Sequence, residues 1–77
     1  MGKIKLIWDF RGPNGNNTAI HHEKHLKEFF KIEKKKLFES GIETLNEMHH
    51  IAYAIINEEN LDEIKKTLKP SRGRKAI

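Results

Sequence analysis

Cysteine is absent from this chain of 77 residues, and its absence excludes disulfide bridges and thiolate metal sites. A small secreted scaffold held by disulfides is therefore not expected, and the sequence favours a cytoplasmic protein. No apolar run approaches the roughly 18 residues that a membrane-spanning helix requires, and the first residues are charged too early for a secretory signal. We expect a single small domain over residues 1–77, with no internal repeat.

Three patterns that would indicate a particular function are also missing. In His22-Glu23-Lys24-His25, only one residue separates the glutamate from the second histidine, whereas the zinc-protease motif H-E-x-x-H requires two. The turn after Arg11 lacks the glycine and lysine pattern of a phosphate loop. The net charge is +4, but no aromatic residue lies among the basic residues of 69–75 to stack on bases. A solvated basic surface is therefore expected in preference to nucleic-acid binding.

The first half of the chain predicts a strand followed by a long helix. Ile4, Leu6, Trp8 and Phe10 alternate with more polar residues, which is typical of a strand with one buried face. Turn-forming residues follow in 12–16, and a helix is predicted from about residue 18, with Asn17 or Thr18 as its cap. Its packed face contains Ala19, His22, Leu26, Phe29, Phe30, Glu33 and Leu37.

The second half predicts two strands and a short helix. Residues 37–48 are interpreted as a hairpin strand, and residues 50–56 form a β-rich run typical of a central strand. A short helix then follows, capped by Asn57 or Asn60 and stopped by Pro70. Residues 70–77 fit either a short edge strand or a flexible basic tail.

This order places Trp8-Asp9-Phe10-Arg11-Gly12-Pro13 before the first helix and runs Ile51–Ile56 into the second. It resembles the ferredoxin-like domains of the dimeric α/β-barrel superfamily. The resemblance implies an α+β sandwich of β-α-β-β-α(-β) order, with two helices on one face of an antiparallel sheet. The chain is also similar to a group of short uncharacterised bacterial proteins that share the run from Ile7 to Phe29. Proteins that share this fold have many different functions.

A homodimer is predicted from the superfamily resemblance and from the small size of the chain. The resemblance implies that two sheets face one another, and a small chain gains proportionally more from such burial. We expect the sheet face away from the helices to carry one of two apolar series, neither of them polar enough to be left in water. The first series is Ile4, Leu6 and Trp8, and the second is Ile7, Ala52, Ala54 and Ile56.

Five histidines form the most distinctive feature of the composition. His21 and His25 have the i, i+4 spacing that lets two imidazoles bind one zinc, copper or nickel ion, with Glu28 or a distant histidine as third ligand. The alternative is that both are simply solvated. His22 is predicted on the packed face, with Asp9 or Glu33 as its partner. His49 and His50 are expected to point to opposite faces of a strand.

A ligand pocket is predicted near the start of the first helix. Its expected lining is Trp8, Asp9, Arg11, His22 and His50, with His25 nearby. Arg11 and the free amides of the helix start would attract a small anion. The alternative is that Arg11 only pairs with a carboxylate beside an ordinary turn.

These residues lead to a functional hypothesis with alternatives. We expect a homodimeric binding module whose His/Arg-lined pocket holds a metal ion or a small acidic ligand. The alternative is a cofactor-independent enzyme of the dimeric barrel kind, monooxygenase-like or isomerase-like. In that enzyme His22 would act as general base, and Tyr53 or Arg11 would stabilise an enolate-like anion. A structural or regulatory partner protein with no pocket is the third possibility.

Overall fold

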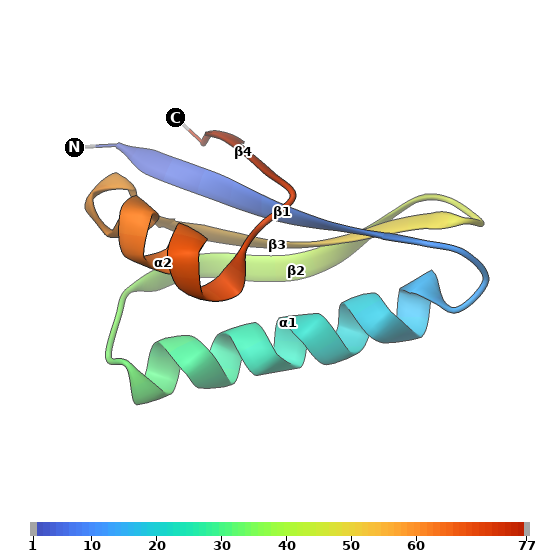
Figure 1. Cartoon of the computed structure of the whole chain (residues 1–77), viewed down its shortest axis with the longest axis horizontal. Helices are drawn as coiled ribbons and strands as arrows, with labels where there is room; N and C mark the ends of the chain where they lie inside the picture. Colours follow the sequence, from blue (N-terminus) through green and yellow to red (C-terminus); the bar gives the residue numbers. More distant parts are fainter. Residues whose placement is uncertain (1, 77) are drawn as a thin grey trace.

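The computed structural model describes residues 2–76 of the chain. Its elements are β1 (Lys3–Arg11), α1 (Gly15–Ile32), β2 (Leu37–Asn46), β3 (His49–Asn57), the 3-10 helix η1 (Glu58–Asn60), α2 (Leu61–Leu68) and β4 (Arg72–Lys75). The four strands form one antiparallel sheet in the order β2-β3-β1-β4 (Figure 1). The predicted α+β ferredoxin-like layout is confirmed.

The core lies between the sheet and the two helices. From β1, Ile4, Leu6 and Trp8 point to this side, as their alternation predicts. They pack with Leu26 and Phe30 of α1, Ala54 and Ile56 of β3, and Ile64 of α2. Removing these apolar side chains from water is the main stabilising contribution to the fold.

The start of α1 differs from the prediction. The helix begins at Gly15, so Asn17 and Thr18 lie inside it and cannot cap it. Thr18 instead donates a hydrogen bond to the Asn14 carbonyl, with an oxygen–oxygen distance of 3.1 Å. A Cβ at Gly15 would lie 2.9 Å from the Phe10 carbonyl oxygen. The glycine therefore permits this early start because it lets the helix approach β1 closely.

The end of α1 also differs from the prediction, because the helix stops at Ile32. Glu33 is its C-terminal cap, and Lys34 takes a left-handed φ of 56° that turns the chain toward β2. Glu33 and Leu37 therefore do not belong to the packed helical face. Leu37 starts β2 and packs against the core from there.

The second half follows the predicted order. Residues 37–46 form the expected hairpin strand, and β3 is a central strand between β2 and β1. The helix α2 ends at Leu68, where Lys69 takes a left-handed φ of 47° before Pro70. Asn60 precedes α2 but makes no side-chain cap. Of the two alternatives for the C-terminal residues, the edge strand is observed in Arg72–Lys75, while residue 77 lies outside the described residues.

The sheet face turned away from the helices, here called the open face, corrects the expected apolar series. It carries Lys3, Lys5, Ile7, Asp9 and Arg11 from β1 and His49, Ile51, Tyr53 and Ile55 from β3, which are the alternate positions of the two strands. Ala52, Ala54 and Ile56 face the helices instead. Ile7 and Ile51 are each only 4% exposed. Much of the exposed surface on the open face therefore comes from the polar and charged side chains around them. No helix among residues 2–76 is long and apolar enough to cross a membrane.

Candidate functional site

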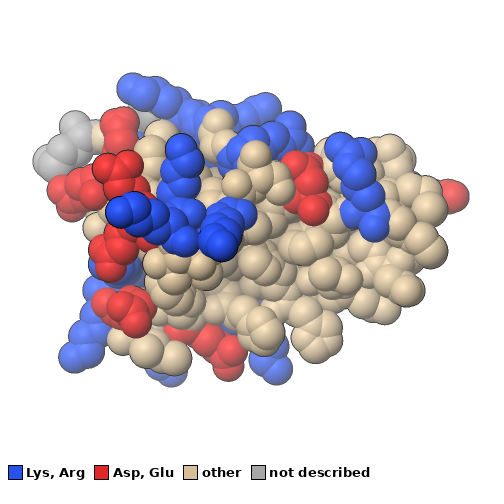
Figure 2. Space-filling model, in the orientation of Figure 1, with Lys and Arg blue, Asp and Glu red and all other residues tan. Residues whose placement is uncertain are grey.

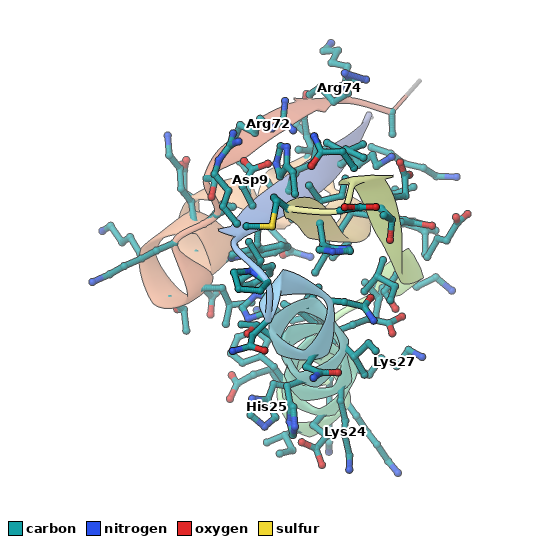
Figure 3. All side chains as sticks on the ribbon, turned by 90° about the vertical axis from the view of Figure 1, so that its right-hand side faces the viewer. Asp9, Lys24, His25, Lys27, Arg72 and Arg74 are labelled. Carbon is teal, nitrogen blue, oxygen red and sulfur yellow. The ribbon has the colours of Figure 1, made fainter. Side chains whose placement is uncertain are left out.

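The sheet separates the predicted pocket into two environments. Trp8, His22 and His50 lie on the helix side, because Trp8 and His50 occupy inward positions of their strands. Asp9 and Arg11 occupy the outward positions of β1. Figure 3 also shows His25 on the part of α1 remote from the sheet. The prediction of one pocket holding all of these side chains is therefore wrong.

His22 packs between two aromatic rings. Its ring centroid lies 4.9 Å from that of Trp8 and 5.3 Å from that of Phe10. Its Nε2 atom is buried and has no hydrogen-bond partner within the described chain, so the expected partners Asp9 and Glu33 are wrong. Burial lowers the pKa of His22, and the nearby His25 lowers it further. His22 is therefore favoured in its neutral form.

His50 has partners for both ring nitrogens and is buried. Its Nδ1 accepts a hydrogen bond from the Thr44 hydroxyl at 3.0 Å, and its Nε2 donates to the Glu47 carbonyl at 3.3 Å. The ring also approaches α1, since a Cβ at Gly15 would meet it at 3.1 Å. These contacts give His50 a structural role in joining the β2–β3 hairpin to the start of α1.

The open face contains a network around one carboxylate oxygen. Oδ1 of Asp9 accepts from His49 Nε2 at 2.7 Å and from Arg72 Nη2 at 3.1 Å. The Asp9 amide also donates to the Ser71 hydroxyl at 3.2 Å. Burial alone would raise the pKa of Asp9, but the His49 hydrogen bond and the Arg72 charge outweigh it and lower that pKa. Figure 3 shows Asp9 and Arg72 on neighbouring parts of the sheet.

Neither His49 nor Arg72 was among the predicted site residues. The opposite orientations of His49 and His50 are confirmed. Because side chains alternate along a strand, a buried His50 places His49 on the open face, and this feature of the sequence could have identified it. Which carboxylate His49 meets depends on the pairing register, in which Arg11 lies directly opposite His49 and Asp9 opposite Ile51. The contact with Arg72 depends on β4 pairing with β1, which no local pattern specifies.

Tyr53 also lies on the open face. Its hydroxyl donates to Glu39 Oε2 at 2.9 Å, and this hydrogen bond, together with burial, raises the tyrosine pKa. Its ring lies across Gly41, where a Cβ would be 2.8 Å from the hydroxyl oxygen. Tyr53 and His22 are on opposite sides of the sheet. The predicted catalytic pair therefore cannot act on one substrate.

Charge on the open face is divided between its two edges. Glu39 and Glu43 lie on β2 at one edge, where Glu43 pairs with Lys5 at 3.3 Å. Arg72 and Arg74 lie on β4 at the other edge. The open face is thus acidic along one side and basic along the other.

His21 and His25 are exposed on α1, with ring centroids 6.4 Å apart. Within residues 2–76, no group of three or more histidine, aspartate or glutamate side chains is arranged to hold a metal ion. The pair therefore offers two donors, and metal binding by His21 and His25 stays a prediction.

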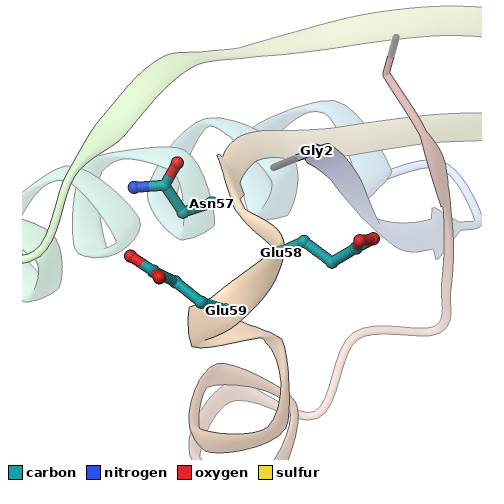
Figure 4. Close-up of a pocket in the computed structure, with 4 residues that line it drawn as sticks. All are labelled: Gly2, Asn57, Glu58 and Glu59. Carbon is teal, nitrogen blue, oxygen red and sulfur yellow. The ribbon is translucent and has the colours of Figure 1, made fainter.

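A hollow of about 270 Å³ lies beside the end of β3. It is lined by Gly2, Asn57, Glu58 and Glu59 (Figure 4). The carboxylates of Glu58 and Glu59 point in different directions in this view, so they do not converge on one ligand. A larger groove lies beside β4 and is described below.

Comparisons of the chain with protein-family models, with curated proteins and with solved structures find no match. Function is therefore inferred from the contacts, charges and cavities of the structure.

Proposed function

We propose that the protein is a homodimeric binding module whose two open faces pack together and enclose a His/Arg-lined site for a small acidic ligand. The observation that carries this proposal is the division of charge across the open face. It extends the superfamily resemblance, which implies facing sheets, to a specific arrangement of the two copies.

The arrangement follows from symmetry. A two-fold axis that runs along the strands, between the two sheets, places β2 of each copy opposite β4 of its partner. Glu39 and Glu43 of one copy then face Arg72 and Arg74 of the other. Such complementary charges fix the orientation of two partners and disfavour the alternative in which β2 faces β2 and β4 faces β4. Ile55 and Tyr53 of β3 supply apolar surface between the charged edges, and Phe38 adds apolar surface on β2, where Lys3 lies over its ring.

The proposed ligand site lies at Arg11 and His49. The two residues are direct cross-strand partners, so their side chains leave the same face next to each other. Asp9 is already paired with His49 and Arg72, whereas Arg11 forms no ion pair within residues 2–76. The cluster therefore keeps a positive charge for an incoming carboxylate. Enclosure between two sheets would strengthen that attraction by excluding water.

Sedimentation equilibrium tests the dimer. The wild-type protein should give twice the chain mass of 9.0 kDa. Arg74→Glu alone, or Glu39→Lys with Glu43→Lys, should weaken the dimer about tenfold because like charges then face each other. Combining the three changes should restore the affinity. The proposal would be overturned by a monomeric wild type. It would also be overturned if Arg74→Glu, or Glu39→Lys with Glu43→Lys, associated as well as the wild type.

Malonate binding followed by amide NMR shifts tests the ligand site. Saturable shifts are expected at Arg11 and His49, with loss of binding in Arg11→Gln. The matched control is Lys24→Gln, which removes one exposed positive charge from α1. Equal loss in both variants would show that only net charge matters and would exclude a site at Arg11.

Catalysis is the second candidate function, and one observation favours it. His49 is held by a carboxylate at 2.7 Å, which is the arrangement that orients an imidazole for general acid–base chemistry. The candidate base is thus His49, in place of His22. Turnover of an acidic substrate that is lost in His49→Gln, with a changed pH profile in Asp9→Asn, would distinguish an enzyme from a binding module.

A further inference from the structure

The C-terminal part of the chain borders a groove. It lies between α2 and β4, has a volume of about 460 Å³, and borders β1. Its walls are on the helix side of β4, because Gly73 and Lys75 are the residues paired with Leu6 and Ile4 of β1. The groove is therefore separate from the Arg11 and His49 site on the open face.

Apolar atoms come from Ile4, Leu6 and Leu61 in the lining of this groove. Gly73 keeps this lining open, since a Cβ there would lie 3.2 Å from Cδ2 of Leu6. The end of α2 is held in place by Trp8, whose Nε1 donates to the Leu68 carbonyl at 2.9 Å. The hydrogen bond from Trp8 ties α2 to the sheet, so the apolar residues that line the groove are held in place relative to one another.

The rim of the groove is basic. Lys65 of α2 and Lys75 of β4 line it from the helix side, and Arg74, whose β1 partner Lys5 is on the open face, lines it at the edge of the sheet. None of these three forms an ion pair within residues 2–76. The segment 65–75 contains six basic residues and no acidic one. Figure 2 shows Lys and Arg side chains over the region of α2 and β4, with Asp and Glu side chains beside them toward the left, while the right-hand end is largely uncharged.

We propose that this groove binds a small organic acid that carries an apolar body, with its carboxylate held by Lys65 and Lys75 and its apolar part against Leu61. The volume lies in the range of small-molecule sites. Apolar lining favours burial of a hydrocarbon portion, and unpaired ammonium groups on the rim favour an anionic head. A purely inorganic anion would leave the apolar floor in water, and a neutral or cationic amphiphile would leave the lysines unpaired.

Amide NMR titrations with four probes test this inference on the full chain. Octanoate should give saturable shifts within residues 61–75. Acetate shares its head but lacks the tail, inorganic phosphate lacks the tail, and octyltrimethylammonium carries the tail on a cation. All three should bind at least about tenfold more weakly, since each forfeits one of the two interactions. Equal shifts with octyltrimethylammonium would overturn the role of the lysines.

Two matched variants complete the test. Lys65→Gln with Lys75→Gln should weaken octanoate binding about tenfold, whereas Lys24→Gln with Lys31→Gln, which removes the same charge from the exposed side of α1, should leave it within about twofold. Unchanged binding in the groove variant would overturn the proposal. The proposal would also be overturned if octanoate gave no shifts and the protein cosedimented with phosphatidylglycerol vesicles. The basic rim would then bind a lipid surface. Malonate shifts at Arg11 report separately on the proposed function.

Discussion

Two histidines of α1, His22 and His25, are three residues apart but have different environments. His22 packs against Trp8 and Phe10, while His25 is exposed. His22→Ala should therefore lower the free energy of unfolding by about 1–2 kcal/mol, through the loss of packing on two aromatic rings, and His25→Ala should change it by less than about 0.5 kcal/mol. Urea unfolding of the two variants measures both values. A larger effect at His25 would contradict the observed helix phase.

The unpaired nitrogen of His22 also predicts a pH dependence. Because burial lowers the pKa of His22 in the folded protein, the unfolded chain takes up the proton first as the pH falls. The contribution of His22 is thus fully present above the unfolded histidine pKa of about 6.5, and it is lost as the pH falls through the folded value. His22→Gln should lose less stability than the wild type between pH 7.5 and 5. A pH dependence as steep in His22→Gln as in the wild type would contradict this assignment.

Gly41 matters because Tyr53 lies across it. Gly41→Ala places a methyl group 2.8 Å from the Tyr53 hydroxyl, so the ring must move and weaken its hydrogen bond to Glu39. We expect a loss of about 1–3 kcal/mol in stability. In a Tyr53→Leu background the same change should cost much less. A double-mutant cycle by thermal melting measures this difference, and equal costs in both backgrounds would show that the ring is not the cause.

At the scale of elements, β4 is a short strand whose attachment depends on side chains of other strands. Asp9 of β1 binds Arg72 through its carboxylate and Ser71 through its amide. Asp9→Asn removes the negative charge that holds Arg72 and His49. Amide hydrogen exchange in Arg72–Lys75 should then accelerate by about tenfold, while β3 residues such as Ala54 stay protected. Uniform acceleration across the sheet would indicate global destabilisation instead of local release of β4.

The elements themselves were largely predictable, but their ends and contacts were not. The alternation of Ile4, Leu6 and Trp8 identified β1 and its buried face, since a period of two has one structural meaning. The start of α1 was missed because Gly15 is used for its small size against Phe10, and propensity alone does not reveal such a contact. The end was missed because Glu33 and Leu37 continue the helical spacing by chance across the turn at Lys34.

At the scale of the whole molecule, the proposed homodimer predicts that stability depends on concentration. Mass action raises the melting temperature of an associating protein as its concentration rises. We expect the wild type to melt several degrees higher at about 1 mM than at about 10 μM. Arg74→Glu should reduce this dependence. Calorimetry at both concentrations provides the measurement, and a melting temperature independent of concentration would contradict the dimer.

By itself the sequence determined the α+β order, the opposite orientations of His49 and His50, and the position of Trp8 in the core, because each follows from a local period or turn. Only the tertiary structure decided which charged groups meet. Asp9 pairs with His49 and Arg72 because strand register and the position of β4 bring together residues separated by up to 63 positions. The pairing of β4 with β1 also created the groove beside β4, which no local pattern specifies. Trp8 and Arg11, by contrast, lie on opposite sides of the sheet because side chains alternate along β1.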